Sequence, residues 1–451
     1  MITLKQAAAW CGGRVAEEFA DLCFSGAQFD SRNLRQGELF VALSGARDGH
    51  DFVSVALEKG ATAVLASKPL DSEVPVIYVD DTLKALQAIS KGYRESLSAM
   101  CVGITGSVGK TTTKEMVAAV LGGKYRTQKT PQNFNNDIGL PVTLLGLRED
   151  CEAAVLEMGM NHRGEISVLT ALAQPDIAAI TNVGTMHIEH LGSRENILQA
   201  KLEMLEGLRP DGKVIFCGDN DLLWREAKTY GAVCYGFEAH NDLRALEVQT
   251  ADGVTTFVAE GMGERFSVVL PTVGNHHVLN ALAAIAVGLL CQVPVQAMQT
   301  GLETFRNTGM RQNIYRQKGL CIVEDCYNAG PESMAAALQV LAQQEGRKIA
   351  VLGGMLELGG HAPEAHRQVG QLAAQSAELL FAYGEQKENY LLGAAGMPYA
   401  RGFDSHEELA QALLEQVQPE DCLLFKGSRG MHMERVLRLF LDNYHGGDRD
   451  E

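Results

Sequence analysis

The sequence has no excess of basic residues. It contains 39 lysines and arginines against 56 aspartates and glutamates, which gives a formal net charge of −17. A nucleic-acid-binding surface normally shows a basic stripe, and none is present here. We therefore expect no nucleic-acid partner. An acidic protein can still bind phosphates where backbone N–H groups and a few lysines or arginines surround them.

Long apolar runs and paired cysteines are also missing. No stretch approaches the eighteen apolar residues that would suggest a membrane-spanning helix, and the N-terminus lacks the pattern of a signal peptide. The ten cysteines include no C-x-x-C pair, which favours reduced thiols over a disulfide framework or a zinc site. These absences predict a cytoplasmic protein without a membrane span.

The chain of 451 residues alternates short apolar strands with helices, which predicts an α/β protein of several domains. Composition and pattern divide it into three units, at residues 1–97, 98–310 and 311–451. We expect a small α/β domain, then a central α/β domain of the phosphate-loop ATPase type, then a Rossmann-like doubly wound domain. The third unit lacks a G-x-G-x-x-G fingerprint at its first turn, which argues against dinucleotide chemistry.

A glycine-rich loop in the central unit has the pattern of a phosphate-binding loop. T-G-S-V-G-K-T at 105–111 follows a predicted strand at 100–104 and precedes a predicted helix at 113–121. The glycines let successive N–H groups point at an anion, and the helix N-terminus adds partial positive charge. Ile104 stands where the general pattern has a further glycine. The expected nucleotide-binding residues are Gly106, Ser107, Val108, Gly109, Lys110, Thr111 and Thr112.

A carboxylate and an asparagine-rich loop follow in the same unit. Glu157 lies near the end of a buried strand predicted at 153–159, where ligands bind in parallel sheets, so it is a candidate Mg²⁺ ligand. The alternative is a solvated acid at a strand end. The loop at 130–141 contains Asn135 and Asn136 and has little structural propensity of its own. It is therefore either a turn or a ligand surface.

Two further positions are ambiguous from the residues alone. Ser31 and Arg32 lie in a polar turn, and their spacing favours an ordinary turn cluster over a binding site. Lys201 lies on an apolar helix face within a predicted helix at 194–208, where a lysine is usually snorkelling toward solvent.

Two classes of function fit a nucleotide site of this kind. One is an ATP-dependent transferase or ligase, and the other is a nucleotide-dependent binding switch. A switch needs one nucleotide domain and a movable loop. This chain has substantial units on both sides of its phosphate loop, which suits bringing two substrates to one phosphate and favours the enzyme.

The motifs taken together, in order along the whole chain, resemble the Mur ligase family of peptidoglycan synthesis. They are D-S-R-x-L-x-x-G-x-L-F-V-A-L at 30–43, T-G-S-V-G-K-T at 105–111, N-F-N-N-D-I-G-L-P at 133–141, L-E-M-G at 156–159, the stretch from Asn182 to His187, Lys201, Arg311, D-C-Y-N-A at 325–329 and K-G-S-R at 426–429. One position departs from the family pattern, because His277 stands where an asparagine is usual. This departure puts in question the affinity for the nucleotide and the preference for its base.

The resemblance implies a reaction and its participants. ATP would phosphorylate the terminal carboxylate of UDP-N-acetylmuramoyl-tripeptide, and the amine of D-Ala-D-Ala would attack the acyl phosphate. The asparagine-rich loop favours this acceptor over the alternative, a free amino acid added to the UDP-linked dipeptide. The implied cofactors are ATP and Mg²⁺, and we expect a monomer.

The resemblance also implies roles for particular residues. Catalysis would involve Lys110, His187 and Lys201, with one Mg²⁺ on Thr111 and Glu157 and a second on His187 and a carbamylated Lys201. The remaining implied contacts are Asn280, Arg311, Asp325 and Asn328 for the nucleotide or incoming substrate, and Ser31, Arg32, Asn135, Asn136, Lys426, Ser428 and Arg429 for the peptide and sugar substrate.

Overall fold

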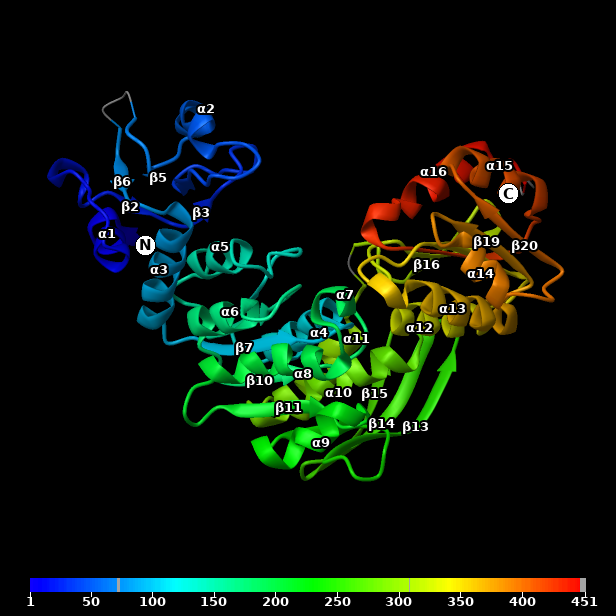
Figure 1. Cartoon of the computed structure of the whole chain (residues 1–451). Coiled ribbons are helices and arrows are strands. Elements are labelled where there is room, and N and C mark those ends of the chain that lie inside the picture. The colour runs from blue at the N-terminus through cyan, green and yellow to red at the C-terminus, as the bar shows by residue number, and fades with distance from the viewer. Residues whose placement is uncertain (71–73, 308, 447–451) are drawn as a thin grey trace.

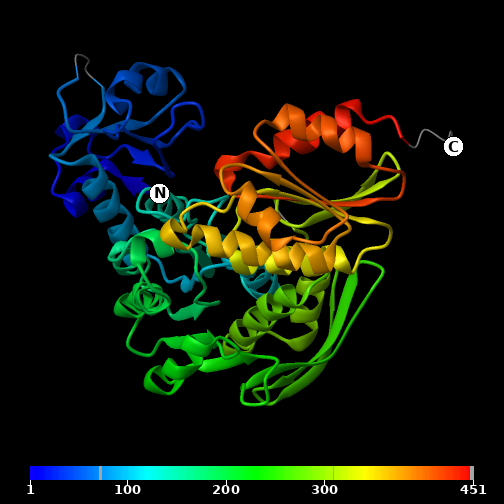
Figure 2. The ribbon, with the colours of Figure 1, turned by 45° about the vertical axis from the view of Figure 1, so that its right-hand side comes forward.

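The computed structural model describes residues 1–70, 74–307 and 309–446. Three principal sheets lie in succession along the chain, and the regions around them form the three α/β domains that the sequence predicts. The N-terminal and C-terminal domains lie at opposite ends of the central domain in Figure 1, and Figure 2 shows the C-terminal domain above the central one. The three-domain α/β prediction is confirmed, whereas the boundaries at 97 and 310 stay predictions.

The N-terminal domain is built on a parallel sheet with the strand order β3-β4-β5-β6. Every residue of its central strands β4 and β5 is buried. A short antiparallel pair, β1-β2, joins the first helix to this domain. The elements are β1 (Ile2–Thr3), α1 (Leu4–Cys11), β2 (Cys23–Phe24), β3 (Ala27–Gln28), β4 (Leu39–Val41), α2 (Val53–Glu58), β5 (Ala63–Ala66), β6 (Val76–Tyr78) and α3 (Thr82–Ser96), with 3₁₀ turns at Glu17–Phe19 and Gly49–Phe52.

The central domain contains a nine-stranded sheet, ordered β15-β14-β13-β12-β11-β10-β7-β9-β8. The six strands from β12 to β8 are parallel to their neighbours, whereas β13, β14 and β15 pair antiparallel with one another. The strands are β7 (Met100–Thr105), β8 (Thr127–Lys129), β9 (Ala153–Glu157), β10 (Ile177–Ile180), β11 (Lys213–Cys217), β12 (Val233–Gly236), β13 (Leu243–Ala251), β14 (Val254–Gly261) and β15 (Glu264–Leu270).

Helices cover this central sheet. The strongly apolar helix α10 is almost entirely buried, which is why its sequence shows no polar face. The helices are α4 (Lys110–Gly122), α5 (Gly139–Leu145), α6 (Glu165–Ala173), α7 (Ile188–Leu191), α8 (Arg194–Leu202), α9 (Asp221–Tyr230), α10 (Asn275–Leu290) and α11 (Val295–Glu303), with a 3₁₀ turn at Glu203–Gly207.

The C-terminal domain has a six-stranded sheet with the order β16-β17-β21-β18-β19-β20. All neighbours are parallel except the edge pair β16-β17. The elements are β16 (Asn313–Gln317), β17 (Leu320–Asp325), α12 (Pro331–Ala342), β18 (Lys348–Gly353), α13 (Ala362–Ser376), β19 (Leu379–Tyr383), α14 (Lys387–Gly393), β20 (Tyr399–Phe403), α15 (His406–Gln416), β21 (Cys422–Lys426) and α16 (Met433–Asn443), with 3₁₀ turns at Gly359–His361 and Arg429–Met431.

Two predicted helices differ from the observed ones near the candidate site. The helix predicted at 113–121 begins earlier, at Lys110, because Gly109 adopts the left-handed conformation that ends the loop. The helix predicted at 194–208 gives way to a 3₁₀ turn after Leu202. There the carboxylate of Glu203 accepts hydrogen bonds from Gly164 N at 2.8 and 2.9 Å, which ties the turn to α6.

Candidate active site

The phosphate loop curls tightly between β7 and α4. Gly106 and Gly109 both have positive φ angles, +156° and +82°. A Cβ on Gly106 would overlap Thr181 Oγ1, and one on Gly109 would lie 2.7 Å from Asn280 Oδ1. Both positions therefore require glycine, for conformation and for space.

Contacts from the neighbouring strand β10 hold this loop in shape. Ser107 N and Val108 N each donate to Asn182 Oδ1 at 3.0 Å, and Thr181 Oγ1 donates to Val108 O at 2.8 Å. Lys110 Nζ folds back on the loop and donates to Gly106 O at 2.8 Å. Burial lowers the pKa of Lys110. In this arrangement Asn182 accepts from two of the loop N–H groups, and the Lys110 ammonium lies within the turn.

Asn182 is a functional candidate that the sequence analysis places only within a motif. Its side-chain oxygen occupies two N–H donors that a phosphate-binding loop offers to an anion. One sequence feature could have identified Asn182, namely its position as a polar residue just beyond the C-terminal end of a buried parallel strand.

Oxygen ligands suited to Mg²⁺ meet beside the loop. Thr111 Oγ1 donates to Glu157 Oε2 at 2.9 Å, and Asn135 Nδ2 donates to Glu157 Oε1 at 2.8 Å. Glu157 is only 2% exposed, at the end of β9, so it is not the solvated acid of the alternative interpretation. Mg²⁺ commonly binds one or two protein oxygens together with substrate phosphates, and Thr111 with Glu157 fits that pattern. Among the described residues there is no group of three or more histidine, cysteine or acidic side chains placed to hold a metal.

The two asparagines of the 130–141 loop have different environments. Asn135 contacts Glu157, as above. Asn136 Oδ1 accepts a hydrogen bond from Gly139 N at 2.8 Å and so supports the start of α5. Both asparagines line the cleft described next, so this loop is part of its wall as well as a turn.

A cleft of about 780 Å³ lies between the central and C-terminal domains. It begins at the phosphate loop and extends to the ends of β17 and β21. Most of the predicted site residues line it: Ser107, Val108, Gly109, Lys110, Thr111, Thr112, Asn135, Asn136, Glu157, His187, Asn280, Arg311, Asp325, Asn328 and Lys426.

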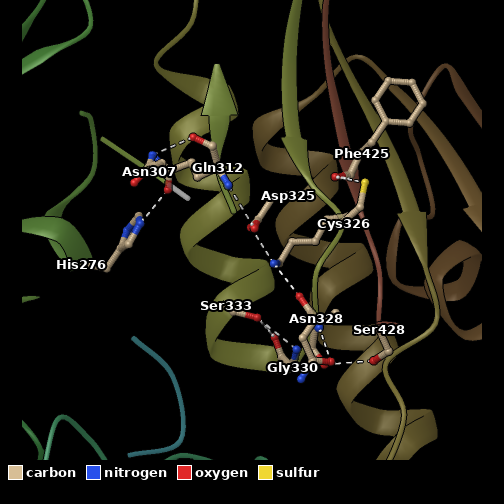
Figure 3. A network of polar contacts seen from close by, with 12 residues as sticks. His276, Asn307, Gln312, Asp325, Cys326, Asn328, Gly330, Ser333, Phe425 and Ser428 are labelled. Carbon is tan, nitrogen blue, oxygen red and sulfur yellow. Dashed lines mark hydrogen bonds and ion pairs between the residues drawn. The ribbon is translucent and has the colours of Figure 1, made fainter. Parts of the chain in front are cut away.

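A polar network forms the C-terminal wall of the cleft. Lys426 Nζ donates to Asp325 Oδ2 at 2.6 Å and to Asn328 O at 2.9 Å. Asp325 Oδ1 accepts from Gln312 N at 3.2 Å, and Gln312 Oε1 lies 2.6 Å from His276 Nε2. Figure 3 follows this network from His276 through Gln312 to Asp325 and Asn328. The network therefore connects the start of α10 to the C-terminal sheet.

Two more side chains define the region where the domains meet. The Arg311 guanidinium lies 3.6 Å from the centre of the Tyr327 ring, a cation–π contact. His277 is 3% exposed and packs against His276, with ring centres 4.3 Å apart. Burial holds the pKa of His277 well below its ordinary value, so this ring is neutral at neutral pH.

Lys201 is buried and is not a snorkelling lysine. Its side chain is 1% exposed, and burial, with a smaller contribution from the Lys110 charge, lowers its pKa well below the ordinary value. Gly106 and Lys201 are not among the residues that line the cleft.

Asn280 contacts the helix that follows the phosphate loop, since its Oδ1 accepts from Thr113 Oγ1, in α4, at 3.1 Å.

The other predicted substrate residues lie outside the cleft. Arg32 is 85% exposed and pairs with Asp30 at 2.7 Å, while Ser31 beside it is buried. Ser428 Oγ accepts from Leu356 N at 2.9 Å, and Arg429 pairs with Glu434 at 2.7 Å. The side chains of Arg32, Ser428 and Arg429 therefore each have a partner in their own domain. Their predicted substrate contacts stay predictions.

His187 occupies the cleft wall with a partner that the sequence analysis does not identify. Its Nδ1 lies 2.5 Å from Oε2 of Glu357, which belongs to the C-terminal domain. The two residues are 170 positions apart, so no local pattern connects them.

Comparison with known families matches all three domains. Residues 24–94 match the catalytic domain described for the Mur ligase family, residues 104–288 the Mur ligase middle domain, and residues 310–429 the Mur ligase glutamate ligase domain. Among the described residues, none of the helices has the length and apolar character needed to cross a bilayer.

Full-length relatives show the same similarity. The chain is 40% identical to a UDP-N-acetylmuramoyl-tripeptide–D-alanyl-D-alanine ligase of Bacillus subtilis, with 98% of each chain covered. A crystal structure of MurF from Acinetobacter baumannii superposes with a TM-score of 0.91 at 32% identity, covering 98% of this chain and 99% of that one. A MurF ligase from Thermotoga maritima in complex with ADP gives a TM-score of 0.84 at 31% identity, covering 94% and 99%.

Proposed function

The chain belongs to the Mur ligase family, and we propose that it joins D-Ala-D-Ala to UDP-N-acetylmuramoyl-tripeptide at the expense of ATP. The products are the UDP-linked pentapeptide, ADP and phosphate. The observation that carries this proposal is the cleft, where an ordered phosphate loop faces a polar wall from a second domain. The full-length similarity to ligases of this specificity selects the substrates.

The chemistry requires activation of a carboxylate. A carboxylate does not accept an amine until one of its oxygens becomes a leaving group, and phosphorylation by ATP makes it one. The amine of the dipeptide then attacks the acyl phosphate, and the tetrahedral intermediate collapses to the amide with loss of phosphate. The protein must therefore stabilise negative charge first at the γ-phosphate and then at the developing oxyanion.

The residues of the phosphate loop provide the first stabilisation. We assign the phosphate contacts to the loop N–H groups and to Lys110, whose ammonium is already within the turn. Mg²⁺ bound at Thr111 and Glu157 would neutralise phosphate charge and orient the γ-phosphate. Asn280, Arg311, Asp325 and Asn328 border the same cleft and are proposed to bind the nucleotide or the incoming amine.

His187 and Lys201 are proposed to serve a second Mg²⁺. An ordinary lysine would be a cation and would repel the metal. Because Lys201 is buried and its pKa is lowered, its neutral amine can add CO₂ and release a proton, which gives an anionic carbamate. The carbamate has two hard oxygen ligands of the kind that Mg²⁺ prefers.

The N-terminal domain is proposed to bind the UDP-sugar end of the substrate. Ser31 and Arg32 lie in its polar turn, and the exposed guanidinium of Arg32 is accessible to a diphosphate. Asn135 and Asn136 would contact the peptide part of the substrate. Lys426, Ser428 and Arg429 would also contact the substrate. We expect a monomer that acts in the cytoplasm.

Omitting each substrate in turn tests this function. ADP release is measured with ATP, UDP-N-acetylmuramoyl-tripeptide and D-Ala-D-Ala, and the products are identified by mass spectrometry. We expect rapid ADP release and a pentapeptide product only with all three. Equal ATP turnover with and without the other substrates, and no new peptide bond, would favour a nucleotide-dependent switch.

A further inference from the structure

Residues 182–189, which comprise a loop and the first residues of α7, contact both the phosphate loop and the C-terminal domain; we call this segment the bridging loop. At its start, Asn182 Oδ1 accepts from Ser107 N and Val108 N, and Gly184 N donates to Ser107 Oγ at 2.9 Å. The bridging loop therefore fixes the phosphate loop at one end. Its other end reaches the C-terminal domain.

Glu332 is the first of two carboxylates that the C-terminal domain directs at the bridging loop. It lies in the first turn of α12 and accepts from Thr185 N at 2.8 Å and from Thr185 Oγ1 at 3.0 Å. A Cβ on Gly184 would lie 2.7 Å from Glu332 Cδ, so this approach depends on a glycine in the bridging loop. The contact is a close fit between two domains.

Glu357 is the second carboxylate. Its Oε2 lies 2.5 Å from His187 Nδ1, and its backbone oxygen accepts from Glu189 N at 3.3 Å. The segment that presents Glu357 is held in turn by its own domain. Leu356 N donates to Ser428 Oγ, and Met355 N donates to His366 Nε2, both at 2.9 Å.

The two residues that meet here both have unfavourable backbone conformations. His187 has φ +65° and Glu357 has φ +61°, in the left-handed region that non-glycine residues rarely adopt. Such conformations persist where the surroundings enforce them, and they concentrate at functional sites. Glu357 is 41% exposed, so as an ion pair alone it would add little to stability. Ten other non-glycine residues of the described chain also have positive φ angles, so the conformation alone marks no site; what distinguishes His187 is its place in the cleft wall.

We propose that Glu332 and Glu357 are positioning residues, which hold the bridging loop so that His187 presents its Nε2 to the cleft when the C-terminal domain is docked. The two ring nitrogens lie on opposite sides of the imidazole. Because a carboxylate has no proton to donate, an oxygen of Glu357 2.5 Å from Nδ1 favours the tautomer that carries its proton on Nδ1, and this tautomer leaves the lone pair on Nε2, the form that can bind a metal. This inference rests on the proposed function for the role of His187. Ser428, which does not line the cleft, anchors the segment that carries Glu357.

The tautomer of His187 gives a test that needs no substrate. The full chain is labelled with ¹⁵N-histidine, and the His187 signals are assigned by their loss in His187→Gln. In the unmodified chain we expect the Nδ1–H form. Glu357→Ala should move His187 toward the Nε2–H form, whereas Glu357→Gln should preserve Nδ1–H, because the amide oxygen still accepts the proton. Glu364→Gln, an exposed carboxylate of the same domain, is the matched control.

Turnover provides the second measurement. Glu357→Ala should lower kcat by about 10- to 100-fold, as for other residues that orient metal ligands, while KM for ATP stays nearly constant. Glu357→Gln should lose less, and Glu332→Ala should lower kcat in the same direction.

An unchanged His187 tautomer and unchanged kcat in a folded Glu357→Ala protein would overturn the proposal. Equal losses of kcat in Glu357→Gln and Glu357→Ala would also overturn it, because the amide oxygen of glutamine can still accept a hydrogen bond and should preserve part of the activity. The NMR result does not depend on catalysis, so a change of tautomer in a chain that proves not to be a ligase would contradict the proposed function alone.

Discussion

The phosphate loop and the Ser31–Arg32 turn are both predicted to bind phosphate groups, but they are supported in different ways. The phosphate loop is held by Asn182 and Thr181, about 75 residues away in the chain. The side chain of Arg32 pairs with Asp30, two residues away, and is 85% exposed, and the backbone oxygen of Arg32 accepts from Lys59 Nζ at 3.2 Å. The nucleotide side of the site is thus shaped by long-range contacts before any ligand binds, whereas the sugar side is shaped locally.

This difference predicts different kinetic effects. Groups that are fixed in advance can favour the transition state over the ground state and so affect kcat. An exposed side chain that is ordered by its ligand contributes mainly uniform binding, which affects KM. Substitutions on the two sides can therefore separate them.

Lys110→Ala should have the largest effect. Loss of the ammonium at the γ-phosphate is expected to lower kcat by about 1000-fold, because a preorganised charge is removed from a buried site. The thermal midpoint should change little, since Nζ bonds only to backbone oxygens of its own loop. Lys84→Ala, at an exposed lysine of α3, is the control. Near-normal ligation by Lys110→Ala would refute the phosphate-loop assignment.

Lys201→Ala should lower kcat by about 100-fold, since it removes the proposed anionic metal ligand from a buried position. Short carboxylic acids in solution should restore part of the activity by filling the vacated space. Steady-state rates with and without the added acid measure this rescue. Full activity of the variant would contradict the assignment, as would a bare amine at Lys201 in a high-resolution map with nucleotide and Mg²⁺ bound.

Arg32→Ala tests the Ser31–Arg32 turn, in contrast to the phosphate loop. We expect KM for the UDP-linked tripeptide to rise by about 10-fold with kcat nearly constant, because the lost contact is a charge-assisted bond made equally in both states. Arg35→Ala, at an exposed arginine of the same turn region, should leave KM unchanged. A loss in kcat as large as that of Lys110→Ala would erase the contrast between the two sides.

The smallest expected effect is the pH dependence of the Asp30–Arg32 pair. The hydrogen bond from Arg32 lowers the pKa of Asp30 in the folded chain. Stability from this pair is therefore present above the unfolded pKa and is lost as pH falls through the folded pKa. The thermal midpoint of the unmodified chain should slightly exceed that of Arg32→Ala at neutral pH, and the difference should shrink as the pH falls through the lowered folded pKa of Asp30. A difference that grows on acidification would have the wrong sign.

The parts of the site that were predictable from sequence depend on local patterns. The loop at 105–111 could be identified because its glycines, lysine and threonine are adjacent and stand between an apolar strand and a helix. Glu157 could be identified because it ends a short buried strand. The doubly wound α/β pattern of the third domain was predictable from the same alternation of apolar runs and helices, whereas its strand order was not predicted.

The long-range contacts could not be predicted in this way. Nothing near Asn182 shows that its side chain accepts from Ser107 and Val108, and nothing near Glu357 shows that it meets His187. Helix α3 also has no predicted counterpart, although Asp81 caps its start by accepting from Leu83 N and Lys84 N at 3.0 Å. The cap of α3 is a local contact, whereas the contacts of Asn182 and Glu357 are determined by tertiary pairing, which has no period in the sequence.

The most direct test of the proposed function compares two acceptors in separate reactions. The enzyme is given ATP with UDP-N-acetylmuramoyl-tripeptide and D-Ala-D-Ala, and separately the UDP-linked dipeptide with free diaminopimelate or lysine, and the products are quantified by mass spectrometry. We expect the pentapeptide to form far faster than any product with a free amino acid. Faster ligation of a free amino acid onto the dipeptide would contradict it and would move the enzyme to the preceding step.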